Sequence, residues 1–306
     1  MKKEIIYELP SLYRDNMRIT GYRFGKGKDT LCIVGSIRGN EIQQLYTCSR
    51  IVKRFRELEE KDAFLKNKSV LVIPCVNSSS MNIGKRFWPT DNTDINRMFP
   101  GYNLGETTQR IAAGLFEKIQ GFEYGIQFSS FYIPGMFAPH VRIMETGYEN
   151  QEDAKLFGLP YTLIRTPKPY DTTTLNYNWQ IWETEAFSLY TPATDCVDKE
   201  SAEQAVEAVL RFMNHKKICK YKTHQGYISD VVKEKSLKPV LTKRAGIFEC
   251  LVKVNDKVEK GELLGNIIDT YEGSVIFEIR APKDGVVFFI NSRPMVHEDT
   301  PVFKLL

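Results

Sequence analysis

The segment TLCIVGSI at residues 30–37, followed directly by RGNE at residues 38–41, decides the fold of this chain. Residues 69–74 form a second apolar run, and both runs have the composition of strands buried on both faces of a parallel sheet. Between them, residues 42–65 carry apolar residues at helical spacing, with charged residues on the other face. Strand, helix and strand in this order form a βαβ unit, so the sequence predicts an α/β sheet with helices on both faces.

Length and composition exclude several classes of protein. With 306 residues, of which 42% are hydrophobic, the chain can bury one large core and a smaller module. Its 42 Lys and Arg nearly balance its 38 Asp and Glu, so charge alone indicates no nucleic-acid and no membrane partner. The basic run at residues 53–56 lies beside glutamates, which favours a solvated helix face over a binding stripe.

The N-terminal residues carry no apolar targeting stretch, and no segment has the length of a membrane span, so we expect a cytoplasmic protein. The 6 cysteines are scattered without a C-x-x-C pair, which favours free thiols over disulfides.

The remaining pattern predicts two domains. Helices are expected at residues 107–119 and at residues 199–214, the latter after an N-cap at Asp198, with a strand at residues 124–128. From Gly246 onward the chain changes to short strands broken by glycine-containing turns. We therefore expect an α/β domain at residues 1–222 and a β-rich domain at residues 223–306.

Four segments together carry a family resemblance. Residues 35–41 (GSIRGNE) compare with G-x-H-G-x-E, residues 74–78 (PCVNS) with a strand ending in Asn-Pro, and residues 94–101 (DINRMFPG) match D-x-N-R-x-F-P-G at every fixed position. The fourth segment is the C-terminal β-module. With these motifs the chain resembles the succinylglutamate desuccinylase/aspartoacylase family, a branch of the zinc carboxypeptidase-like hydrolases.

The resemblance implies a mixed, largely parallel sheet flanked by helices, as in zinc carboxypeptidases, with a smaller C-terminal all-β domain similar to the barrel-sandwich of lipoyl and biotinyl carriers. A carrier needs an exposed lysine at one hairpin tip, and the matching tip at residues 270–273 (TYEG) has none. We therefore expect this domain to be structural or to gate substrate access.

The resemblance also implies a zinc ion, held by a histidine and a glutamate of the first motif and by a histidine of a later strand. In this chain the matching positions are assigned to Arg38, Glu41 and Phe128, and Tyr190 stands at the general-base position. A guanidinium has no acceptor atom and a phenyl ring cannot ligate, so the sequence predicts a degenerate metal site without zinc and without an assigned catalytic residue. We expect an ion pair between Arg38 and Glu41, because a buried carboxylate needs a compensating charge.

The D-x-N-R segment is intact, and the resemblance implies that Asn96 and Arg97 hold the carboxylate or acyl oxygen of a substrate. The alternative is that these residues only fasten their loop. Arg86 and Arg142 are further candidates for substrate binding, against the alternative of solvated arginines. The expected partner is a small carboxylated molecule.

Two functions remain open from the sequence. The first is a divergent family member that has lost zinc hydrolysis and retains the carboxylate-binding pocket. The second is an active metal-dependent hydrolase that deacylates an N-acyl amino acid or a small peptide, with Glu41 and His140 at the metal.

Overall fold

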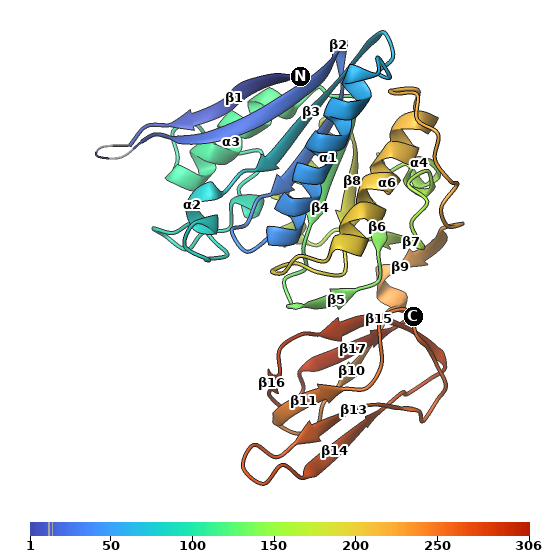
Figure 1. Ribbon diagram of the computed structural model, residues 1–306. Helices are drawn as coiled ribbons and strands as arrows, with labels where there is room; N and C mark the ends of the chain where they lie inside the picture. The colour runs from blue at the N-terminus through green and yellow to red at the C-terminus, as the bar shows by residue number, and fades with distance from the viewer. Residues whose placement is uncertain (12, 14) are drawn as a thin grey trace.

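The computed structural model describes residues 1–11, 13 and 15–306, and it shows a large α/β part joined to a smaller β-module (Figure 1). Within the described residues, the large sheet has the strand order β1-β2-β4-β8-β6-β7-β9, and β3 also pairs with β2. Its strands are β1 (Lys2–Leu9), β2 (Met17–Ser36), β3 (Asn67–Cys75), β4 (Tyr124–Ser129), β6 (His140–Met144), β7 (Tyr161–Arg165), β8 (Glu185–Tyr190) and β9 (Asp230–Lys233). The sheet is mixed and largely parallel, as expected.

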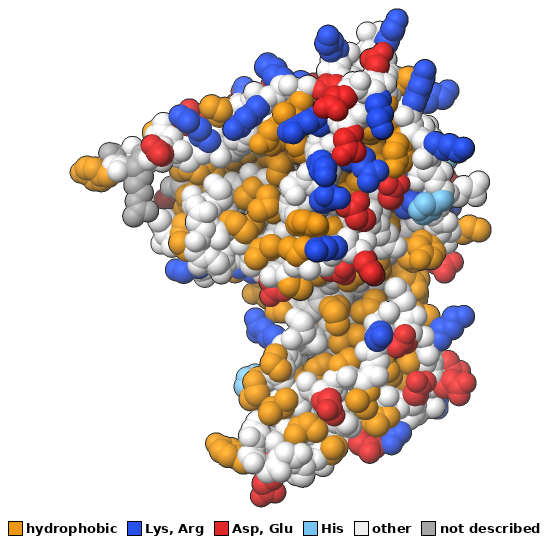
Figure 2. All heavy atoms as spheres, viewed as in Figure 1, with side chains coloured by type: hydrophobic (Ala, Val, Ile, Leu, Met, Phe, Trp, Pro, Cys, Tyr) orange, Lys and Arg blue, Asp and Glu red, His pale blue; other side chains and the backbone are white. Residues whose placement is uncertain are grey.

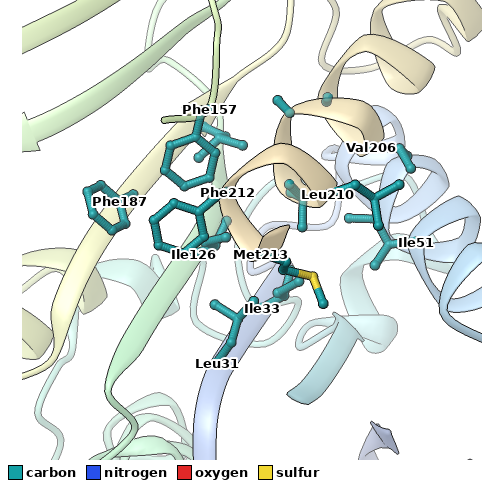
Figure 3. Packing of buried hydrophobic residues seen from close by; sticks show 14 of the residues in the cluster. Leu31, Ile33, Ile51, Ile126, Phe157, Phe187, Val206, Leu210, Phe212 and Met213 are labelled. Carbon is teal, nitrogen blue, oxygen red and sulfur yellow. The ribbon is translucent and has the colours of Figure 1, made fainter. Parts of the chain in front are cut away.

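The central strand β2 is buried on both faces, because its side chains alternate between two hydrophobic clusters. Leu31 and Ile33 belong to one cluster, and Cys32 and Val34 belong to the other. The first cluster lies under α1 (Ile42–Glu60) and α6 (Lys199–His215), and Figure 3 shows how side chains of these helices meet those of the strands. The second lies under α3 (Thr107–Ile119). The predicted βαβ unit, with helices on both faces, is therefore confirmed.

Before it enters the core, β2 bends around the start of β3. Residues 22–27 pair with residues 72–67 of β3, and residues 28–36 pair with residues 68–75. The bend is at Gly27, whose φ of 148° disfavours other residues, and a Cβ there would lie 2.2 Å from the carbonyl carbon of Asn67.

The helices agree closely with the sequence pattern. Helix α3 has the expected bounds, and α6 begins after Asp198, whose side chain accepts hydrogen bonds from the backbone of Glu200 (3.1 Å) and Ser201 (3.4 Å). Helix α1 ends five residues earlier than expected, because Asp62 adopts a left-handed conformation with φ 51°. The shorter helical elements are α2 (Ser78–Met81), α4 (Gln151–Lys155), α5 (Leu175–Ile181) and the 3-10 turns η1 (Ile95–Arg97), η2 (Pro169–Asp171) and η3 (Glu234–Ser236).

The outer face of α1 and α6 is charged and solvated. On the side shown in Figure 2, basic and acidic side chains alternate over these helices. Arg50 donates to Glu203 at 2.7 Å and Arg54 to Glu207 at 3.4 Å. Arg50 and Arg54 of α1 are thus paired across the helix contact, as expected for a solvated face.

The C-terminal module consists of two antiparallel sheets that share one hydrophobic core. One sheet has the order β10-β17-β15-β12 and the other β14-β13-β11-β16. The strands are β10 (Lys238–Leu241), β11 (Gly246–Cys250), β12 (Lys257–Val258), β13 (Leu263–Ile268), β14 (Val275–Arg280), β15 (Gly285–Asn291), β16 (Met295–Val296) and β17 (Pro301–Leu305). Leu264 and Phe248 of the second sheet pack against Phe303 and Val287 of the first.

The two parts are joined by strand pairing as well as by the connecting chain. Strand β5 (Gly135–Phe137), which lies between β4 and β6, pairs with β15 of the module. The expected boundary after residue 222 precedes β9. This strand pairs with β7 of the large sheet, and the strands of the module begin at β10.

None of the helices in the described ranges is long and apolar enough to cross a membrane.

Candidate functional site

A cavity of about 970 Å³ lies beside the ends of β2, β4 and β8. In parallel sheets, ligands bind at the carboxyl ends of the strands, so this is where a binding site is expected. Arg38 follows β2, Ser129 ends β4 and Tyr190 ends β8, and all three line the cavity. Of the residues assigned from the sequence, Asn96, Arg97 and Arg142 also line it.

Arg38 bridges two carboxylates at the inner end of the cavity. Its Nη1 donates to Glu41 Oε1 at 3.1 Å, while its Nε and Nη2 donate to Asp94 Oδ2 at 3.0 and 2.9 Å. Burial alone would lower the pKa of Arg38, but the charges of Asp94 and Glu41 outweigh it and raise that pKa. The expected ion pair between Arg38 and Glu41 is confirmed, and Asp94 is a partner that sequence reasoning missed.

Glu41 has no acceptor position left for a metal. Its Oε1 also accepts from Ser130 Oγ at 2.6 Å, and its Oε2 accepts from the backbone N–H groups of Ile37 and Arg38, both at 3.0 Å. A carboxylate offers about four lone-pair directions, and protein donors occupy all of them. In the part of the chain that the structure describes, no three His, Cys, Asp or Glu side chains converge as a metal site would require. The residues at this position therefore do not fit the zinc ion that the resemblance implies.

Phe128 does not face the cavity. It is fully buried in the same cluster as Ile126, on the face of β4 that packs against α1 and α6. Because side chains alternate along a strand, the β4 side chains that line the cavity are those of Gln127 and Ser129. Phe128, which the sequence assigned to the second ligand position, therefore points away from the cavity, because the alternation of side chains along β4 directs it into the core.

Tyr190 lines the cavity as an apolar wall rather than as a base. Burial raises its pKa, so the phenol keeps its proton at neutral pH. The ring of His140 stacks on Tyr190 with centroids 4.6 Å apart, and its Nδ1 lies 2.7 Å from the carbonyl oxygen of Ala138. Burial lowers the pKa of His140 to about 3, so the ring is neutral and donates from Nδ1. His140 is not part of the cavity lining.

Arg142 is a cation of the cavity wall that lies over aromatic rings. Its guanidinium carbon lies 4.7 Å from the ring centroid of Tyr190 and 5.9 Å from that of Phe131. Its Nε is buried and makes no hydrogen bond to any described residue. A buried donor of this kind is costly unless something else accepts its hydrogen bond.

Asn96 and Arg97 fasten a neighbouring loop. Asn96 Oδ1 accepts from Gln127 Nε2 and from the backbone of Leu175, both at 3.3 Å. Arg97 Nη1 donates to the carbonyl oxygen of Tyr170 and, at 3.5 Å, to Asp171 Oδ1. These contacts are those of the loop-fastening alternative, although both side chains still border the cavity.

Arg86 lies behind the cavity wall rather than in it. It donates to Asn40 Oδ1 at 3.3 Å and to the carbonyl oxygen of Phe131 at 3.2 Å. Burial, followed by the nearby charge of Arg38, lowers the pKa of Arg86. Its contacts are those of a residue that positions the wall segment around Phe131.

The cavity is lined by more cations than anions. Among the described residues the cations are Arg38, Arg97, Arg142, Arg165, Lys168, Lys233, Lys235 and Lys304, and the anions are Asp94, Glu145, Asp171 and Glu234. Sequence reasoning missed most of these, because they come from separate segments that only the fold brings together. Strand parity could have identified Gln127 and Ser129.

Comparisons with known proteins agree with this architecture. Residues 27–128, which contain Arg38, Glu41 and the D-x-N-R segment, match the family model described as the succinylglutamate desuccinylase/aspartoacylase catalytic domain. The chain is 21% identical over 300 residues to the N-alpha-acetyl-L-2,4-diaminobutyric acid deacetylase of Halomonas elongata, covering 88% of this chain and 79% of that protein.

Solved structures show the same fold over nearly the whole chain. A succinylglutamate desuccinylase from Silicibacter sp. TM1040 superposes with a TM-score of 0.82 at 16% identity, covering 99% of this chain and 94% of the other. The product-bound ectoine utilization protein EutE of Ruegeria pomeroyi superposes with a TM-score of 0.77 at 18% identity, covering 97% and 92%. Residues 27–128 of the chain are thus similar to the catalytic domain of the succinylglutamate desuccinylase/aspartoacylase family, and the whole chain has the fold of solved structures that carry this family's name.

Proposed function

We propose that this family member binds a small carboxylated molecule in its cavity and does not carry out zinc-dependent hydrolysis. The observation that supports this most strongly is the ion-pair cluster of Arg38 with Glu41 and Asp94. A protonated guanidinium stands where the resemblance places a metal ligand, and Glu41 has all its acceptor positions occupied. Tyr190 cannot replace the general base, because its phenol is protonated.

Arg142 is the proposed primary contact for the carboxylate. A guanidinium donates two parallel hydrogen bonds to a carboxylate, and that of Arg142 has a buried donor without a partner among the described residues. Asn96 and Arg97 flank the same cavity and have secondary roles, because both already hold the loop at Tyr170 and Leu175. Arg86 acts indirectly by positioning the wall at Phe131.

The test is a thermal-shift screen of N-acyl amino acids and dicarboxylates. A ligand at about one hundred times its Kd stabilises the fold by about 2.7 kcal/mol, which should raise Tm by roughly 5 °C. Arg142→Gln should weaken binding about tenfold or more, because it removes a charged donor. Arg280→Gln is the matched control, since Arg280 is exposed and lies outside the cavity.

Two results would overturn the proposal. If no carboxylate stabilises the wild type, the cavity is not a site for such ligands. If the stabilisation survives in Arg142→Gln, the contact is wrongly assigned.

The second candidate is an active metal-dependent hydrolase of N-acyl amino acids or small peptides. The similarity to a protein named as an N-alpha-acetyl-L-2,4-diaminobutyric acid deacetylase favours it. Release of acetate from N-acetyl amino acids that depends on added zinc and is lost in Glu41→Gln would support this function over the binding function.

We further propose that the C-terminal module is a barrel-sandwich without a carrier role. Two sheets around one core are consistent with such a fold, and the turn between β13 and β14 carries Tyr271 and Glu272 where a carrier has lysine. A cytoplasmic location is consistent with the six cysteines, all of which are free thiols.

A further inference from the structure

A cluster of titratable side chains lies at the amino ends of β4 and β8, on the face of the sheet away from the cavity. Glu185 begins β8 and has the strand parity of Phe187, which packs in the core cluster under α1 and α6. Asp153 lies in α4, within the connection between β6 and β7. Lys216 follows α6, and its ammonium nitrogen lies 4.9 Å from the ring centroid of Tyr124, the first residue of β4. The described lining of the cavity includes none of these titratable residues.

The two carboxyl groups of this cluster have one ammonium group between them. Asp153 Oδ2 accepts from Lys216 Nζ. The side chain of Glu185 lies within hydrogen-bonding reach of Asp153, and its Oε1 is buried without a hydrogen bond to any described residue. An ionised Glu185 would therefore place a second negative charge beside Asp153 and leave a buried oxygen without a donor, and both are costly.

A protonated Glu185 removes both costs. Its O–H donates to Asp153, and the single remaining negative charge is balanced by Lys216. Burial, together with the hydrogen bond and charge of Asp153, raises the pKa of Glu185 to about 8, against the opposing effects of Lys216 and Asn150. Burial alone would lower the pKa of Lys216, but its hydrogen bond to Asp153 raises that pKa overall, and burial raises the pKa of Tyr124 to about 12. Lys216 and Tyr124 thus keep their protons at neutral pH.

We propose that Glu185 and Asp153 share one proton at neutral pH, and that this proton fastens α4 to the start of β8. As the pH rises, the Glu185 O–H bond breaks and releases its proton to the solvent, so that two carboxylates stand beside one ammonium group. Helix α4 joins β6, which carries Arg142, to β7, whose residues 164 and 165 line the cavity. The shared proton therefore makes the attachment of this connection sensitive to alkaline pH, whichever ligand the cavity binds.

Urea unfolding at pH 6 and pH 8 tests the shared proton. The folded pKa of Glu185 lies above the ordinary value of 4.5, so its contribution to stability is fully present below pH 4.5 and is lost as the pH rises to about 8. Between pH 6 and pH 8, the unfolding equilibrium constant of the wild type should rise about tenfold or more relative to that of Glu185→Gln. The glutamine amide donates to Asp153 at either pH, and groups such as His140 titrate alike in both proteins.

Glu152→Gln is the matched control, because Glu152 is an exposed residue of the same helix and pairs with Lys155. It should keep the pH dependence of the wild type. If Glu185→Gln also keeps that dependence, Glu185 does not hold the proton and the proposal is overturned.

Two further measurements test the proton and the helix separately. Infrared spectra of the wild type, which need no variant, should show the C=O absorption of a protonated carboxyl group at pH 6 and its loss by pH 9; absence of this band at pH 6 would overturn the shared proton. Amide hydrogen exchange of residues 151–155, corrected for its intrinsic pH dependence, should accelerate about tenfold from pH 6 to pH 9 in the wild type and not in Glu185→Gln. Equal exchange in the two proteins would show that the proton does not fasten α4.

Discussion

Two groups of cations border the same cavity and differ in what balances them. At the inner end, Arg38 shares its guanidinium between Glu41 and Asp94, and every donor it uses ends on a protein carboxylate. On the walls, the buried Nε of Arg142 has no acceptor among the described residues, and burial lowers the pKa of Lys304 although the charge of Glu234 opposes it. A cation whose charge is balanced inside the protein stabilises the fold, whereas an unbalanced one is available to a ligand. The comparison therefore separates structural from ligand-binding residues.

The largest expected effect is on the free energy of unfolding, and it distinguishes the paired cation Arg38 from the wall cation Arg142. Arg38→Ala should lower the free energy of unfolding by about 3 to 5 kcal/mol, because it leaves two carboxylates in a buried site without their partner. Arg142→Ala should change it by less than about 1 kcal/mol, since it breaks no ion pair among the described residues. Urea unfolding of both variants measures the difference, and equal losses would remove the distinction between the groups.

The register of β4 gives a second test of which side chains face the cavity. Phe128→His should cost about 3 kcal/mol, because an imidazole replaces a buried phenyl ring in the core. Ser129→His should cost less than about 1 kcal/mol, since the new ring points into the cavity. If the two variants reversed this order in chemical denaturation, the orientation of the β4 side chains described here would be wrong.

His140 should make the stability of the fold sensitive to acid. Its pKa in the folded protein is about 3, below the ordinary value of 6.5, so the unfolded chain binds the proton first as the pH falls. Its contribution to stability is present above pH 6.5 and is lost as the pH falls from 6.5 towards 3, by about 2 kcal/mol between pH 6.5 and pH 5.

In His140→Phe, the free energy of unfolding should not show this loss when urea unfolding at pH 6.5 is compared with urea unfolding at pH 5. Comparison of the two pH values within each variant removes any effect of the substitution on baseline stability. An unchanged pH dependence would show that His140 is not the buried neutral group described here.

The smallest effect concerns a residue that shares features of both groups. Arg97 borders the cavity but already donates to Tyr170 and Asp171. Arg97→Gln should therefore weaken carboxylate binding by about threefold at most, less than Arg142→Gln, when both are measured by calorimetry. A larger loss in Arg97→Gln than in Arg142→Gln would restore the role that the D-x-N-R motif implies.

The sequence predicted the parts of the fold that depend on local pattern. The strand at residues 30–37, the helix bounds of α3 and the N-cap at Asp198 all follow from apolar spacing and capping chemistry. The pair of Arg38 and Glu41 also followed, because the two residues are three positions apart on one turn and their charges require each other. Asp94 could not be paired with Arg38 from the sequence, because their contact joins distant segments.

The sequence was less informative about the cavity. Motif matching placed Phe128 at a ligand position, whereas the pleat of β4 turns it into the core. That the buried Nε of Arg142 has no acceptor among the described residues depends on the fold around it, which no local pattern reports. Lys304 reaches the cavity only because β5 pairs with β15 and carries the module against the large sheet.

The central claim is that Arg38 occupies the metal position and that Glu41 has no acceptor left for zinc. The most direct measurement is elemental analysis of untagged protein that has been equilibrated with zinc and then dialysed. The structure predicts a zinc content far below one per chain, because a stable site needs at least three protein ligands. About one zinc per chain retained through dialysis would contradict the claim.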